Sequence, residues 1–291
     1  MRNIMAELLK QYARKPGVTF SPIDGVRLIR SDVSVRKTPL VYEPNIFILA
    51  QGSKRVYMGE EILHYDPNHF LVMSVPLPLE CETFASPEEP LLGISIKVDP
   101  ATVGELLLDM DSEIYYQQNF AGAFSSELTE EMTDAAVRLL RCINHEKDCR
   151  ILGPQIVREI LYRILCTKQG AALRALAVRH SNFSQIARVL RRMQSEFDND
   201  FTMEALASEA NMSLSAFHHN FKAVTSTSPL QYLKSIRLHK ARLMMIQDGM
   251  NASDASGRVG YASPSQFSRD FKKLFGRTPA SESREIRTGI N

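Results

Sequence analysis

The sequence predicts an α+β protein in which a small antiparallel β-barrel with helices precedes an all-α domain with two helix-turn-helix units. Three observations support this prediction. Short alternating segments fill residues 19–97, helical spacing takes over after residue 99, and one helical pattern occurs twice near the end of the chain. The 291 residues are enough for two cores, so we expect domains at 1–180 and 181–291.

The barrel is predicted from runs of β-forming residues with alternating polarity. These runs include VRLIRSDVSV, NIFILAQGSKRVYMG and HFLVMSV. Turn signals separate them at Pro44-Asn45, Gln51-Gly52 and Asp66-Pro67-Asn68. Several short strands at this spacing are typical of a small antiparallel barrel or sandwich.

Helices are predicted on both sides of the barrel segment. The first residues, MRNIMAELLKQYARK, have the pattern of an amphipathic helix and not of a signal peptide. After Asp99-Pro100 the segments ATVGELLLDM, SSELTEEMTDAAVRLLRCINH and PQIVREILYRILCTK show helical spacing. Ser126, followed by Thr129 and Glu130, indicates a helix start, and we expect Pro154 in a first helical turn. These helices could form a dimer surface or simply cover the barrel.

The C-terminal pattern is a duplication with an offset of 50 residues, which marks a repeated structural unit. The first copy contains Ala205, Ser213, Ser215, Phe217, Phe221, Lys222 and Pro229. The second contains Ala255, Ser263, Ser265, Phe267, Phe271, Lys272 and Pro279. Each copy predicts a short helix, a turn and a second helix, the arrangement of a helix-turn-helix DNA reader.

The helix boundaries of the repeat follow from capping residues. Thr202 and Ser213 are expected to cap the two helices of the first unit, and Ser263 the second helix of the second unit. Pro229 should open a long helix to about Gln247, which would span about 27 Å and hold the units at a fixed separation. Gly276 should end the last helix.

The second helix of each unit has an apolar side and a polar side. Phe217, Phe221 and Val224, and in the second unit Phe267, Phe271 and Leu274, should be buried. The opposite side then offers donors and acceptors for base edges in a major groove. The candidate base contacts are Ser215, His218, His219, Ser265, Gln266 and Arg269. Lys222, Lys272 and Lys273 suit phosphates.

The distribution of charged residues along the chain agrees with DNA binding by the C-terminal part but does not establish it. From His180 to the end there are 15 Lys and Arg against 10 Asp and Glu, whereas the preceding residues carry 20 against 23. No apolar run approaches the roughly 20 residues that cross a bilayer. We therefore expect a cytoplasmic protein with a basic DNA-reading part.

The segment RVGYASPSQFSRDFKKLFGRTP resembles the signature of the AraC/XylS family of bacterial transcription regulators. The resemblance covers about residues 183–285. It implies a seven-helix domain whose two recognition helices enter successive major grooves, and base contacts from the six residues above. The first recognition helix, SLSAFHHNF, departs from the family pattern because it carries no arginine.

The N-terminal segment resembles the cupin-like domain of one AraC/XylS subfamily. The resemblance covers about residues 20–110 and includes PNIFILAQGSKRVYMGEEILHYDPNHFLVMSVPLPLECET and PLLGISIKVDP. It implies a sensor of small effectors whose helices pair subunits. It also makes an activator, a homodimer and contact with RNA polymerase the expectation.

Candidate effector residues in the barrel are Cys81, Arg36, Gln51 and Tyr57. A thiol at position 81 could sense electrophiles or oxidants, or it could be a structural cysteine, because negative neighbours disfavour the thiolate. No enzyme activity, cofactor or metal is expected. His64 and His69 are five residues apart and form no HxH pair, and no cysteine lies at zinc-finger spacing. A cupin-type metalloenzyme and a nonspecific architectural nucleic-acid binder are the alternatives.

Overall fold

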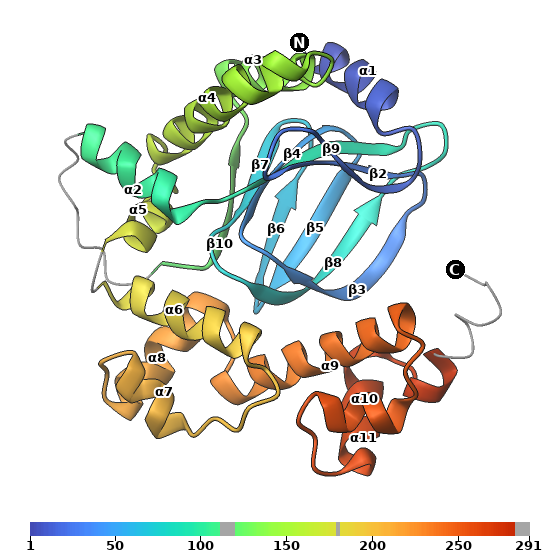
Figure 1. Cartoon of the computed structure of the whole chain (residues 1–291), viewed down its shortest axis with the longest axis vertical. Helices are drawn as coiled ribbons and strands as arrows, with labels where there is room; N and C mark the ends of the chain where they lie inside the picture. Colours follow the sequence, from blue (N-terminus) through green and yellow to red (C-terminus); the bar gives the residue numbers. More distant parts are fainter. Residues whose placement is uncertain (111–119, 179–180, 283–291) are drawn as a thin grey trace.

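The computed structural model of the chain describes residues 1–110, 120–178 and 181–282. The first part holds a barrel with helices along one side (Figure 1). Its elements are α1 (Arg2–Tyr12), β1 (Gly17–Phe20), β2 (Val26–Ser31), β3 (Val35–Tyr42), β4 (Asn45–Gln51), β5 (Ser53–Met58), β6 (Glu61–Tyr65), β7 (His69–Met73), β8 (Leu77–Phe84), β9 (Leu91–Lys97), α2 (Pro100–Asp109), β10 (Ala123–Glu127), α3 (Glu130–Cys142), α4 (Glu146–Leu165) and α5 (Ala171–Ala177).

The strands form two antiparallel sheets that enclose an apolar interior. One sheet has the order β1-β2-β9-β4-β7-β10 and the other β3-β8-β5-β6. Side chains alternate between the two faces of each strand. In β4, Phe47 and Leu49 join the barrel interior, whereas Ile46 and Ile48 join a second core that includes α1, α3 and α4. The alternating strands predicted from the sequence are confirmed.

The remaining elements are helices, and they form two similar units. They are α6 (Asn182–Ser195), α7 (Met203–Glu209), α8 (Leu214–Thr225), α9 (Pro229–Gln247), α10 (Ala252–Arg258) and α11 (Pro264–Phe275). The first unit contains α7 and α8, and the second contains α10 and α11. Figure 1 shows α9 running from the first unit to the second beneath the barrel. The α+β fold class is thus confirmed.

Two local expectations were wrong, and one strand was missed. Pro154 lies inside α4, which begins eight residues earlier and has acidic Glu146 and Asp148 in its first turn. Ser126 belongs to strand β10, and Thr129 is the residue that caps α3 by accepting a hydrogen bond from the Met132 amide. The strand β10 pairs with β7, a non-local partner that local sequence patterns do not reveal.

The barrel and the first helix-turn-helix unit share one apolar core. Phe217, Phe221 and Tyr232 form a chain of edge-on rings with centroids 5.5 Å apart. The Tyr232 hydroxyl then donates to the Pro76 carbonyl oxygen at 3.0 Å. The Gly122 amide donates to the Val224 carbonyl oxygen at 2.8 Å, in the last turn of α8. The first unit therefore packs directly against the barrel half of the molecule.

Candidate nucleic-acid interface and sensor residues

The helices α8 and α11 are built alike. Each has twelve residues, and Ser213 and Ser263 cap them by accepting hydrogen bonds from amides three residues on, both at 3.3 Å. Each ends at a residue in the left-handed conformation, with φ of 59° at Ser226 and 75° at Gly276. The duplication in the sequence is therefore a duplication of helix boundaries, because caps fix where each helix starts and stops.

The polar side of α8 is open to solvent. Phe217 and Phe221 are fully buried, and Val224 is almost so. The opposite side presents Ser215, His218, His219 and Lys222, all exposed. These are the four side chains that the sequence assigns to DNA from this helix, and they lie on one face.

The polar side of α11 carries an internal network. Ser265, Arg269, Lys272 and Lys273 are exposed, and Gln266 is half-buried. The Arg269 guanidinium donates to the Gln266 side-chain oxygen at 2.7 Å, and the Gln266 amide donates to Asp270 at 2.9 Å. The arginine is thus held in a defined direction, while Gln266 is already engaged by two neighbours.

Asp270 anchors this network to the rest of the domain. Lys234 of α9 lies 3.3 Å from its carboxylate, and the Tyr261 hydroxyl donates to it at 3.3 Å. Burial alone would raise the pKa of Asp270, but hydrogen bonds from Gln266 and Lys234 keep that pKa below its ordinary value. The carboxylate is therefore charged at neutral pH and serves to position Gln266 and, through it, Arg269.

Arg237 of α9 connects the second unit to the segment that leads from α6 into the first unit. Its guanidinium donates to the carbonyl oxygens of Phe197 at 2.7 Å, Gly260 at 2.9 Å and Asn199 at 2.9 Å. Gly260 lies in the turn of the second unit, and the other two carbonyls lie between α6 and α7. Sequence reasoning missed this residue, because backbone carbonyls leave no signature in a residue pattern.

The four candidate effector residues do not share one site. Cys81 is buried in the barrel interior at 6% exposure. Tyr57 pairs with Glu80 across β5 and β8 and so lies on the other face of the sheet, where its hydroxyl donates to Glu82 at 2.6 Å. Arg36 is exposed on β3, and the Gln51 amide donates to the Pro90 carbonyl oxygen.

Cys81 has polar neighbours inside the barrel. Cys81 of β8 pairs with Val56 of β5, so Val56 and Lys54 lie on the same face of this sheet as Cys81. Tyr65 of β6 pairs with Lys54. Among the described residues, the buried Tyr42 hydroxyl makes no hydrogen bond of ordinary geometry, although the Tyr65 hydroxyl and the Cys81 thiol lie near it. Burial raises the pKa of Tyr42 and of Tyr65, so both are neutral phenols. These groups were not recognised from the sequence.

No candidate metal site is present in the parts of the chain that the structure describes. Those residues contain no group of three or more His, Cys, Asp or Glu that could hold a metal ion. His69 contacts Asp66 at 3.0 Å, and His64 is exposed. Over the same residues, no helix has the length and apolar character required to traverse a bilayer.

A β-barrel joined to two helix-turn-helix units is the architecture of a transcription regulator with a DNA-binding domain and a second, separate domain. The profile of the AraC-type transcriptional regulator N-terminus matches residues 22–172, and that of a helix-turn-helix domain matches residues 206–285. The chain belongs to the AraC-type transcriptional regulators.

Individual relatives match over parts of their length. The RCS-specific HTH-type transcriptional activator RclR of Escherichia coli (strain K12) is 33% identical over 103 residues, which are 35% of this chain and 36% of RclR. The HTH-type transcriptional activator RhaS of Klebsiella pneumoniae (strain 342) is 28% identical over 135 residues, which are 45% of this chain and 46% of RhaS. The chain thus spans less than half the length of either relative.

Solved structures share the fold over nearly the whole chain. An apo variant of ToxT from Vibrio cholerae gives a TM-score of 0.58 at 10% identity and covers 90% of this chain and 98% of that one. Wild-type ToxT bound to an unsaturated fatty acid gives 0.55 at 11% identity, with coverages of 91% and 95%. At such identities the likeness establishes the arrangement of barrel and helical units, not the ligand.

Proposed function

We propose that this protein binds a specific promoter sequence through α8 and α11 and regulates transcription there. The observation that carries the proposal is the pair of capped recognition helices, each with one buried aromatic side and one exposed polar side. Arg237 bonds the second unit to the segment that leads into the first, which favours a single DNA-binding surface formed by both units.

The roles within the surface follow from chemistry. Arg269 is exposed and oriented by Gln266, which suits a bidentate contact to guanine O6 and N7. Ser215, His218, His219, Ser265 and Gln266 are the other base-contact candidates, and Gln266 must exchange its bonds with Arg269 and Asp270 to read a base. Lys222, Lys272 and Lys273 contact phosphates.

A pair of variants tests these roles. The preferred site is first selected from a random DNA pool. Arg269→Ala should then cost about 1–3 kcal/mol of binding free energy and relax the preference at one base position. Lys272→Ala should weaken all sequences alike and reduce the salt dependence by about one ion. If both variants lose affinity equally for the selected site and for random DNA, the assignment of base and phosphate roles is wrong.

The remaining parts of the proposal concern regulation. The protein acts as an activator, as the names of RclR and RhaS favour, and an activator bound at a promoter would contact RNA polymerase. It works as a homodimer, for which α4 offers exposed apolar residues at Ile151, Leu152 and Tyr162. A small effector, or an electrophile at Cys81, changes the balance between conformations by binding one of them more tightly.

The experiment for regulation uses the selected DNA site. Sedimentation of the protein with and without that site measures its subunit number, and transcription from a promoter with the site measures activation. A protein that remains monomeric on DNA, or that only represses, would contradict these two statements while leaving sequence-specific binding intact.

A further inference from the structure

Strand β1 has one open edge. It lies at the end of its six-stranded sheet, where it pairs with β2. Within residues 1–110, 120–178 and 181–282, the backbone of β1 makes no hydrogen bond to any element other than β2. Alternate N–H and C=O groups of residues 17–20 therefore face away from the sheet without a partner in the chain. An open strand edge of this kind is a template for a further strand.

The side chains of β1 leave this edge accessible. Val18 and Phe20 are 56% and 76% exposed, and Thr19 between them is half-buried. Proteins commonly protect an open edge with a charged residue, a proline or a β-bulge within the strand. The strand GVTF has no charge and no proline, and it pairs with β2 without a shift in register. Nothing in β1 itself therefore prevents the pairing of another strand.

We propose that a second copy of this chain occupies the edge, so that two β1 strands pair antiparallel about a two-fold axis centred on Thr19. An axis perpendicular to the sheet keeps each side chain on its own face, so facing residues are an even number of positions apart. Val18 then lies opposite the partner's Phe20, and Thr19 lies opposite its own copy. Aromatic pairs with β-branched residues and Thr–Thr pairs both stabilise antiparallel sheets. The inference rests on the proposed homodimer and names its surface.

Charged residues beyond the ends of β1 favour the same register. Arg14 and Lys15 precede the strand and Asp24 follows it, and all three are exposed. Among the residues that the structure describes, these three form no ion pair with one another or with other side chains. In an antiparallel pair the start of one strand lies beside the end of the other. Arg14 and Asp24 are each five positions from Thr19, so opposite charges meet at both ends of the pair.

A neighbouring register is less favourable. A pair centred on Val18 would place Phe20 opposite Pro16, which has no amide hydrogen to donate across the strands. The centre at Thr19 uses only the four residues of β1, Gly17–Phe20, and leaves Pro16 and Pro22 outside the pair. So small an interface belongs to a weak, reversible complex, and we expect a micromolar dissociation constant without DNA. Adjacent half-sites on DNA would then raise the effective concentration of the second copy.

The test is sedimentation equilibrium of the full-length protein without DNA. We expect a monomer–dimer equilibrium in the wild type. Phe20→Lys should raise the dimer dissociation constant by about tenfold or more, because a lysine on an edge strand hinders pairing. Ile62→Lys is the matched control, since Ile62 is an exposed apolar residue on β6 of the other sheet, and it should leave the constant unchanged. Because Phe20 is exposed, its variant should keep the wild-type circular dichroism spectrum.

Charge reversal tests the register. Asp24→Arg places like charges beside Arg14 and Lys15 at both ends of the pair, and it should raise the dissociation constant by about threefold. The double variant Arg14→Asp/Asp24→Arg restores opposite charges and should dimerise more tightly than Asp24→Arg alone. A double variant that is as weak as the single one would contradict the register centred on Thr19.

Three further results would overturn the pairing itself. They are a wild type that stays monomeric with and without DNA, a Phe20→Lys protein that dimerises as tightly as the wild type, and a dimer that Ile151→Lys abolishes but Phe20→Lys does not. The last result would assign the interface to α4. Footprints of the selected DNA site keep the two proposals apart. Specific footprints by a monomeric wild type refute only the pairing, whereas a β1-dependent dimer without specific footprints refutes only DNA recognition.

Discussion

Removal of the Arg237 guanidinium should loosen the link between the two helix-turn-helix units. Arg237→Met keeps the aliphatic stem and deletes three hydrogen bonds to the carbonyls of Phe197, Gly260 and Asn199. A hydrogen bond to a charged group contributes about 1.5–3 kcal/mol when buried. Two of these bonds are partly buried and the third is exposed, and the freed carbonyls can accept water. We therefore expect the free energy of unfolding of the helical half to fall by about 2–4 kcal/mol.

Urea unfolding followed by circular dichroism at the helix band measures this loss, since the chain contains no tryptophan to report by fluorescence. Arg258→Met is a matched control, because Arg258 is exposed on α10, and it should change the free energy of unfolding by less than about 0.5 kcal/mol. The loosened link should also reduce the preference for one spacing between the two halves of the DNA site. An Arg237→Met protein as stable as the control variant would refute the bridging role.

Other variants probe the contacts around this frame. Gly260→Ala should destabilise the second unit, because φ is +79° there and a Cβ would lie 2.7 Å from the Asp198 carbonyl oxygen; thermal unfolding measures the effect. Tyr232→Phe leaves the Pro76 carbonyl without its buried partner and should cost about 1–3 kcal/mol, detected as faster hydrogen exchange at the junction of barrel and helices. Burial lowers the pKa of His239 from its usual 6.5 to about 4. The unfolded chain therefore takes up a proton first as pH falls, so stability should drop by up to about 3 kcal/mol between pH 6.5 and 4. His239→Leu should remove that part of the pH dependence, and an unchanged profile would contradict it.

The helical half could be predicted almost to the residue because its signals are local. Ser213 and Ser263 cap helices through amides three residues away, and Pro229 opens α9 as expected. The barrel was predictable as a set of strands, since alternation also depends on near neighbours. The helix start predicted at Pro154 was wrong because a long helix can tolerate an internal proline when the turns before and after the proline are held by packing.

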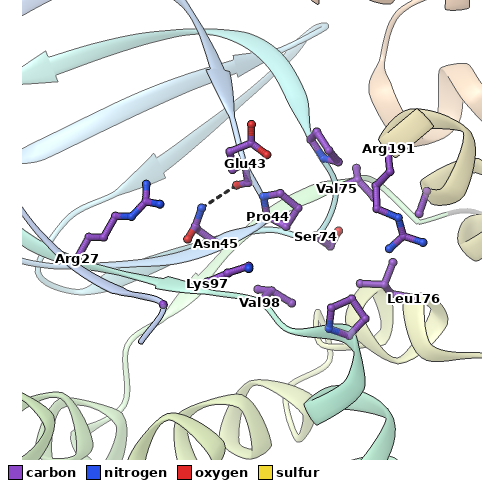
Figure 2. A pocket seen from close by; sticks show the side chains of 14 residues that line it. Arg27, Glu43, Pro44, Asn45, Ser74, Val75, Lys97, Val98, Leu176 and Arg191 are labelled. Atoms are coloured by element: carbon purple, nitrogen blue, oxygen red, sulfur yellow. Dashed lines mark hydrogen bonds between the residues drawn. The ribbon is translucent and has the colours of Figure 1, made fainter. Parts of the chain in front are cut away.

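The missed features all depend on residues that are distant in sequence. Arg237 binds carbonyls 23 and more residues away, and a cavity between the barrel and the helical half combines positions from Gly25 to Arg191 (Figure 2). The candidate effector residues are alike in being reactive or polar, but they do not share a face, because adjacent strand positions such as Glu80 and Cys81 point to opposite faces. The chemical type of a side chain can therefore be predicted from the sequence, whereas the set of side chains that meet in space cannot.

The way the apolar cores are divided makes the two DNA readers unequal. Phe217 and Phe221 of the first belong to the same core as the barrel, whereas Phe267 and Phe271 of the second belong to a smaller cluster made of α9, α10 and α11. Removal of the barrel would expose apolar side chains of the first reader to water, whereas most apolar side chains of the second would stay buried. Under the proposed function, a ligand-induced change in the barrel would consequently act on the first unit before it reaches the second unit through α9.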